Sequence, residues 1–272
     1  MSLALGHINY LNCVPFFHHL ACCGYHGRIT SGVPAELNAL LLEDAIDVSP
    51  SSSFEYGRHW ERYLLLPDLS ISSDGPVGSV LLFSDRALSE LEDIPIAVTG
   101  ESATSVNLMR VVLREWFGVK IVCDYVPEEP VETLIAQGQP VLLIGDLALQ
   151  AAASATTKVY DLGQIWKEKT GLPFVFALWI VREEVAEYLP GELKRLSHSL
   201  RLSLKKALNE VNALAEEYSH TKEMTAAAIV DYWQQMSFGL SPRHQQGLLR
   251  FFALCVKYDL LPEVPQLRFF KA

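Results

Sequence analysis

The 272-residue sequence lacks the features of an exported or membrane-spanning protein. No apolar run approaches the ~20 residues that a transmembrane helix needs. The opening stretch, MSLALGHINYLNCVP, has no basic segment and no small-residue cleavage site after a long apolar run, so it does not read as a secretory signal. The cysteines are odd in number and none forms a CxxC pair, which is typical of reduced thiols. We therefore expect a soluble, cytoplasmic protein.

Positive charge is scarce, and lysine is absent from the first part of the chain. The net charge of −10 argues against nucleic acid and anionic membrane surfaces as partners. The first lysine is Lys120, and every cation before it is an arginine. A small anion bound by the first half of the chain would need arginine, hydroxyl groups or backbone N–H groups at helix starts.

Two common ligand-binding motifs are incomplete. Residues 100–105 form a polar turn before a helix, but they lack the lysine and second glycine of the phosphate-binding motif GxxxxGK[ST]. His18 and His19 would face opposite sides of a helix, with no acidic residue at ligand spacing. We therefore predict neither a nucleotide loop nor a metal site.

Groups for nucleophilic and acid–base chemistry are also few. Cys13 has no histidine beside it in the sequence, which favours packing over a nucleophilic role. No histidine lies between His59 and His198. A general base from the middle of the chain would thus have to be a carboxylate, such as Asp146, or the substrate itself.

Apolar strands alternate with helices along the first two thirds of the chain, which indicates βα units and parallel pairing. Strands are predicted at residues 3–9, 45–48, 62–66, 77–84, 94–99, 120–125, 140–144, 159–162 and 174–182. One helix is predicted from Pro15 to about Cys23, a second begins at Pro34, and a turn of helix follows Ser53. Further helices are predicted over residues 106–117, 131–137 and 147–153. After Arg182 the pattern is helical, with a leucine stripe from Leu193 and helices over 226–236 and 242–258.

This order of elements predicts an α/β protein of two lobes with a ligand cleft between them. The strands at 77–84 and 174–182 are the expected crossings between lobes. Residues 1–83 and 180–272 would form lobe 1, and residues 84–179 an inserted lobe 2. Ligands in such folds bind at the carboxyl ends of strands, between the lobes.

Short polar segments follow the strands and precede helices at residues 9–12, 49–53, 99–105 and 145–146, and residues 66–79 are expected to form a polar binding loop. A helix start offers unpaired N–H groups and roughly half a positive charge. Any one of these segments could be a plain helix cap. Several of them converging on one cleft would hold a carboxylate without any lysine.

Six stretches together resemble the menaquinone-biosynthesis chorismate dehydratases of the futalosine pathway: INYLNCVP, SSSFEY, LLLPDLSISSDGPVGSVLLFS, TGESATSV, LLIGDLAL and DLGQIWKEKTGLPFVFALWIVR. The similarity runs from about residue 6 to residue 182 and then thins into generic helices. The resemblance implies a periplasmic-binding-protein-like fold of type II in a cytoplasmic enzyme. It also implies conversion of chorismate to 3-[(1-carboxyvinyl)oxy]benzoate and water, without a cofactor or a metal.

The same resemblance implies which residues form the site. Asn12 and Ser79 would act at the reacting end of the substrate as catalytic residues. The residues that would bind the substrate, the first four through its carboxylates, are Ser52, Ser53, Thr104, Ser105, Gly145 and Asp146. The base stays open between Asp146 and the enolpyruvyl carboxylate of the substrate, and we favour the substrate.

Three other functions are weighed. The sister enzyme 1,4-dihydroxy-6-naphthoate synthase has a catalytic histidine in the loop that corresponds to residues 144–146, and this chain has none there. A small-anion-binding protein of the same fold without chemistry would be expected to carry an export signal. The sensing lobe of a LysR-like regulator would need an attached helix-turn-helix, for which the strand-first start leaves no room. The oligomeric state is not predicted.

Overall fold

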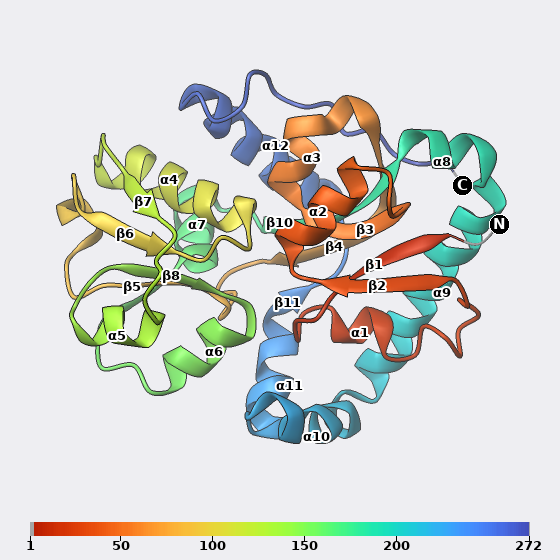
Figure 1. The fold of residues 1–272 in the computed structure, drawn as a ribbon, viewed down its shortest axis with the longest axis horizontal. Coiled ribbons are helices and arrows are strands. Elements are labelled where there is room, and N and C mark those ends of the chain that lie inside the picture. The colour runs from red at the N-terminus through yellow and green to blue at the C-terminus, as the bar shows by residue number, and fades with distance from the viewer. Residues whose placement is uncertain (1–2, 272) are drawn as a thin grey trace.

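The computed structural model describes residues 3–271, which form two β-sheets flanked by helices (Figure 1). The strands of the six-stranded sheet are β1 (Ala4–Ile8), β2 (Arg28–Gly32), β3 (Val48–Ser52), β4 (Tyr63–Ser73), β10 (Phe174–Arg182) and β11 (Met236–Ser237). The strands of the five-stranded sheet are β5 (Val80–Phe83), β6 (Pro95–Val98), β7 (Cys123–Tyr125), β8 (Val141–Ile144) and β9 (Val159–Asp161). Their spatial orders are β11-β4-β10-β3-β1-β2 and β7-β6-β8-β5-β9.

The helices fall into two groups, one around each sheet (Figure 1). Those around the six-stranded sheet are α1 (Val14–Phe17), α2 (Pro34–Leu42), α3 (Ser53–His59), α8 (Glu183–Tyr188), α9 (Pro190–Asn209), α10 (Val211–Lys222), α11 (Ala226–Gln235) and α12 (Pro242–Lys257). Those around the five-stranded sheet are α4 (Ala103–Phe117), α5 (Val131–Ala136), α6 (Gly145–Ala153) and α7 (Leu162–Thr170). We call the first sheet with its helices lobe 1 and the second lobe 2. Among the described helices, none is both long and apolar enough to span a bilayer.

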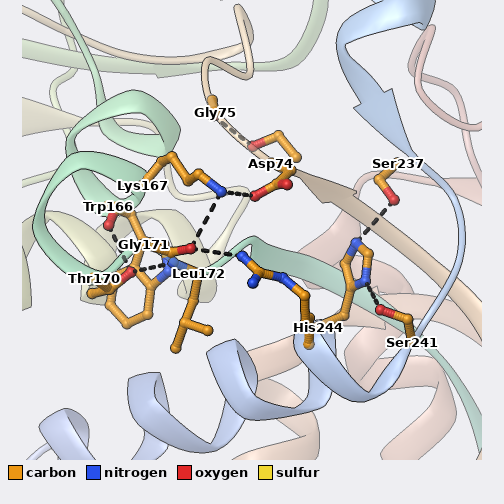
Figure 2. Close-up of polar contacts among 12 residues, drawn as sticks. Asp74, Gly75, Trp166, Lys167, Thr170, Gly171, Leu172, Ser237, Ser241 and His244 are labelled. Carbon is orange, nitrogen blue, oxygen red and sulfur yellow. Dashed lines mark hydrogen bonds and ion pairs between the residues drawn. The ribbon is translucent and has the colours of Figure 1, made fainter.

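The chain passes between the lobes through two short segments, residues 74–79 and 171–173, which lie close together (Figure 2). Lys167 of α7 contacts the carboxylate of Asp74 in the first segment and donates a hydrogen bond of 3.2 Å to the carbonyl of Gly171 in the second. Arg243 of α12 donates to the same carbonyl over 2.8 Å. The two crossings are therefore tied to each other and to lobe 1.

The strands expected to cross between lobes do not do so. β5 pairs only within the five-stranded sheet and β10 only within the six-stranded sheet, so the change of sheet falls in the connecting segments. The division of the chain into domains at residues 83/84 and 179/180 stays a prediction.

Residues 66–73 are not the polar loop that we predicted, because they belong to β4. This strand pairs antiparallel with β10, whose residues are all buried, and the pairing shifts register twice. The serine hydroxyls of β4 find partners in the folded chain: Ser70 donates to the carbonyl of Gly239 over 2.6 Å, and Ser73 to that of Gly75 over 3.0 Å. Only residues 74–79 remain as a loop.

Helix boundaries set by proline and glycine agree with the sequence pattern. Pro34 and Pro242 open α2 and α12, and Gly118 ends α4 with a positive φ of 73°. The helix predicted over residues 15–23 is shorter, since α1 ends at Phe17 and hydrogen-bonded turns follow. The serines of residues 49–52 lie within β3 rather than after it, because they pair with β10.

The hydrophobic core is continuous beneath the crossings. Trp166 of α7 packs edge-on against Phe174 of β10 at a ring-centroid distance of 5.1 Å, and Phe251 of α12 packs against Phe174 at 5.0 Å. In lobe 2 the alternation along β5 sends Leu82 to this core and Leu81 to a smaller cluster under α5 and α6. Buried aromatic side chains from both lobes therefore pack together beside the two crossing segments.

Candidate active site

A cavity lies between the two lobes, and residues of both lobes line it. Its wall is formed by Ile8, Tyr10, Asn12, Pro34, Ser52, Ile71, Val77, Ser79, Val80, Ser102, Ser105, Ile144, Gly145, Phe176, Ala177 and Met236. All five polar segments expected from the sequence contribute at least one of these residues. The convergence of these segments on one cleft is therefore found in the structure.

Helix starts place several polar groups in this wall. The Ser52 hydroxyl caps α3 by accepting from the Glu55 backbone N–H over 3.3 Å. The Ser102 hydroxyl caps α4 in the same way, accepting from the Ser105 N–H over 3.3 Å. Helices α3, α4 and α6 thus point their positive ends at the cavity, which favours an anion there.

Of the predicted site residues, Asn12, Ser52, Ser79, Ser105 and Gly145 line the cavity, while Ser53, Thr104 and Asp146 do not. The Ser53 hydroxyl donates to the carbonyl of Val175 over 2.8 Å and lies 3.3 Å from the Thr104 hydroxyl. The Thr104 hydroxyl in turn accepts from the Phe54 N–H over 3.0 Å. These side chains join α3 of lobe 1 to α4 of lobe 2, and their contact with a ligand stays a prediction.

Asp146 also joins the lobes. One carboxylate oxygen accepts from the Leu11 backbone N–H over 2.9 Å, and the other accepts from the Lys222 ammonium over 2.6 Å. Lys222 further donates to the carbonyl of Asn9 over 3.0 Å. Both oxygens of Asp146 are therefore engaged by lobe 1, a role that the sequence did not reveal.

Tyr10 lines the cavity from lobe 1, and no pattern in the sequence singled it out. Its hydroxyl donates to the Glu101 carboxylate of lobe 2 over 2.5 Å. Burial, followed by the hydrogen bond to Glu101, raises the pKa of Tyr10 well above its ordinary value. The ring lies over Gly145, where a Cβ would come within 3.1 Å of it and where φ is +61°. Glycine at position 145 is what allows the ring to approach.

Ser79 is held from the side away from the cavity. The Tyr232 hydroxyl, on α11, donates to the Ser79 hydroxyl oxygen over 2.9 Å. Burial raises the pKa of Tyr232 far above its ordinary value, so the phenol is neutral. The backbone before Ser79 is fixed by Asp161, whose carboxylate accepts from the N–H groups of Val77 and Gly78 over 2.9 and 2.7 Å. Sequence reasoning missed Tyr232, because nothing local in α11 points to Ser79.

Asn12 presents an acceptor to the cavity. Its side chain lines the cavity, and its Oδ1 atom is buried and receives no donor from residues 3–271. A buried amide oxygen is costly to leave unpaired. It is therefore suited to accept a hydrogen bond from a bound ligand.

The wall has little capacity for acid–base chemistry. Among the described residues that line the cavity, none is an aspartate, glutamate, histidine, lysine or arginine. Tyr10 is the wall's phenol, and its raised pKa keeps it protonated at neutral pH. Within residues 3–271 no group of three or more His, Cys, Asp or Glu side chains is arranged to hold a metal ion. The wall can orient a ligand and stabilise charge through hydrogen bonds and helix starts.

Comparison with known proteins agrees with this geometry. The chain is 33% identical over 264 residues to the chorismate dehydratase of Thermus thermophilus, covering 91% of this chain and 93% of that protein. It is 26% identical over 248 residues to the 1,4-dihydroxy-6-naphtoate synthase of the same organism, covering 84% and 86%. The alkanesulfonate-binding protein SsuA of Xanthomonas axonopodis pv. citri has the same fold, with a TM-score of 0.74 at 12% identity over 97% of this chain and 95% of that one.

The expected fold is confirmed by this likeness: the chain has the two-lobe periplasmic-binding-protein-like fold of type II, with a ligand cleft between the lobes. A family model described as menaquinone biosynthesis, VitK2_biosynth, matches residues 3–257. With the relative at 33% identity, this match shows that the chain belongs to the menaquinone-biosynthesis family.

Proposed function

We propose that the protein is a chorismate dehydratase, which converts chorismate to 3-[(1-carboxyvinyl)oxy]benzoate and water. The observation that carries the proposal is a cavity wall in which hydroxyls, one amide and three helix starts stand among apolar side chains, and none of the described wall residues is charged. Such a wall suits a small dianion whose reaction needs orientation more than a protein acid or base. The likeness to the Thermus thermophilus enzyme over most of both chains supports the same substrate.

The chemistry fits such a wall. The C3–H and C4–O bonds of chorismate break, the electron pair of the C–H bond becomes a ring double bond, and that of the C–O bond leaves with oxygen. The proton and the leaving hydroxide make water, so no oxidant or reductant takes part. Because the ring becomes aromatic, the driving force belongs to the substrate. The protein has to orient the ring and stabilise charge on the departing oxygen.

Removal of the C3 proton needs a base, and none of the described wall residues offers one. Asp146, the candidate carboxylate from the sequence, lies outside the wall and is bound to Leu11 and Lys222. The enolpyruvyl carboxylate of chorismate is attached through oxygen to C3 and can reach the proton there. We therefore assign the base to the substrate.

We assign roles in the reaction to the polar wall residues from their positions in the cavity. Asn12 and Ser79 both line the cavity and act at the C4 hydroxyl. Ser52 and Ser105 stand at the starts of α3 and α4, where hydroxyls and the positive helix ends receive carboxylates. Gly145 leaves room for the Tyr10 ring, which covers the bound ring.

The sister naphthoate-forming activity is disfavoured by the same wall. The resemblance gives that enzyme a histidine in the loop at residues 144–146, where this chain has Ile144, Gly145 and Asp146. No histidine is among the described residues of the wall.

The test is turnover of chorismate by the purified protein, followed by liquid chromatography and mass spectrometry. We expect an aromatic product lighter than chorismate by one water, formed with no added metal or cofactor and absent from a heat-inactivated sample. Asn12→Ala, which removes the cavity acceptor, should lower kcat by about 10²-fold or more. Chorismate that stays unchanged with the native protein would contradict the proposal.

The assignment of the base has its own test in Asp146→Asn. We expect kcat close to that of the native protein, because Asp146 lies outside the cavity wall and both of its carboxylate oxygens are bound by lobe 1. A loss of several orders of magnitude with unaltered substrate binding would overturn the substrate as base.

A further inference from the structure

Tyr232 lies directly behind the cavity wall and contacts Ser79, which faces the cavity. It belongs to α11 of the C-terminal helices, is 3% exposed, and is not itself part of the wall. Its hydroxyl donates a hydrogen bond of 2.9 Å to the Ser79 hydroxyl oxygen, and this hydrogen bond is buried.

The hydrogen bond has a direction, because each hydroxyl has one hydrogen to donate. Tyr232 donates its hydrogen to Ser79. Ser79 then keeps its own hydrogen for a partner in the cavity. Asn12 keeps Oδ1, to which no donor from the described residues is bound. The cavity is thereby given a donor at Ser79 and an acceptor at Asn12.

The position of Tyr232 is fixed by its surroundings. The next residue, Trp233, donates its indole N–H to the carbonyl of Leu11 over 2.7 Å, which ties α11 to the loop that carries Asn12. The Tyr232 ring also lies beside Gly78, where a Cβ would stand 3.8 Å from it. A buried hydroxyl held in this way can hold the hydroxyl of a neighbour in one rotamer.

We propose that Tyr232 is a positioning residue that, through its hydrogen bond to Ser79, aims the Ser79 hydroxyl hydrogen at the leaving C4 oxygen of the substrate. This inference rests on the proposed function. As the C4–O bond breaks and its electron pair moves to oxygen, the Ser79 hydrogen bond stabilises the growing charge. The proton taken from C3 then completes the departing water, and Tyr232 stays protonated throughout.

The experiment is a double-mutant cycle of Tyr232→Phe and Ser79→Ala, read as kcat and KM for chorismate. Tyr232→Phe keeps the buried ring and should lower kcat about 10- to 100-fold with KM within about twofold, because only the orientation of Ser79 is lost. Ser79→Ala should lower kcat at least as much. The double variant should be no slower than Ser79→Ala, since Tyr232 acts through Ser79.

Tyr63→Phe is the matched control. Tyr63 is 1% exposed and lies outside the cavity wall, and its hydroxyl has no hydrogen-bond partner among residues 3–271. Its loss should leave kcat and KM unchanged, and melting temperatures of all variants report on folding.

Two contradictory results are distinguishable. If the native protein leaves chorismate unchanged, the proposed function fails and this inference fails with it. If the native protein is active but the losses in kcat multiply in the double variant, or Tyr232→Phe retains native kcat, the inference alone is overturned.

Discussion

The ion pair between Lys222 and Asp146 offers the clearest measure of how the two lobes are held together. Lys222 Nζ lies 2.6 Å from the carboxylate, and the two side chains are 22% and 16% exposed. A hydrogen bond to a charged group contributes about 1.5–3 kcal/mol when buried, and an exposed ion pair about 0.2–1 kcal/mol. Because both side chains are partly exposed, we expect this pair to contribute about 1–2 kcal/mol, between those two ranges. We expect the lobes to separate for the substrate to enter, so Lys222→Met should lower the ratio of closed to open protein about 5- to 30-fold.

The effect should appear in KM and not in kcat. Neither Lys222 nor Asp146 lines the cavity, so the closed complex is chemically intact once it forms. We expect KM for chorismate to rise by up to the same factor, with kcat within about twofold. Arg195→Met is the control, because Arg195 pairs with Glu192 three residues earlier in the same helix of lobe 1, α9, at 68% exposure.

A cycle with Asp146→Asn decides whether the pair itself is responsible. The two single changes should each raise KM, and the double change should raise it little further, since both remove the same contact. Multiplying effects, or a fall in kcat at constant KM, would refute a closing role for this pair.

Three further changes test the packing and the electrostatics. Gly247→Ala would place a Cβ 2.1 Å from the carbonyl oxygen of Pro173 beside a crossing segment, so we expect a loss of about 1–3 kcal/mol in unfolding free energy; native stability in a denaturant titration would contradict this. Gly145→Ala adds a Cβ within 3.1 Å of the Tyr10 ring at a positive φ and should raise KM for chorismate while the protein still folds, as kinetics and a melting curve would show. Burial lowers the pKa of His7 to about 4 from 6.5. Between these pH values the His7 side chain is protonated in the unfolded chain but not in the folded one, so the unfolding free energy falls as pH drops through this window. His7→Gln should flatten that part of the dependence in unfolding titrations between about pH 4.5 and 7, and an unchanged slope would count against this role of His7.

Local signals predicted helix ends well, and they failed where the partner lies far away in the chain. Proline and glycine act on their own backbone, so the start of α2 at Pro34 and the end of α4 at Gly118 were readable. The serines of β4 looked like a loop because their hydroxyl partners exist only in the folded protein. Ser70, for example, is bonded to the carbonyl of Gly239.

The residues of the candidate site show the same contrast between local patterns and distant contacts. Asn12, Ser52 and Ser105 were predicted because each lies at a helix start within a recognisable stretch, and the structure places all three in the wall. Tyr232 stands 153 residues from Ser79 in sequence, so no local pattern links them. The contact of Asp146 with Lys222 likewise depends on how the C-terminal helices pack against lobe 2.

A crystal structure of the native protein after soaking with chorismate would show whether the cavity between the lobes is the site of dehydration. We expect a planar aromatic ring that carries the enolpyruvyl ether, bound in this cavity with Asn12 and Ser79 at the former C4 position. A puckered, unreacted chorismate ring, or a ligand bound outside this cavity, would contradict this expectation.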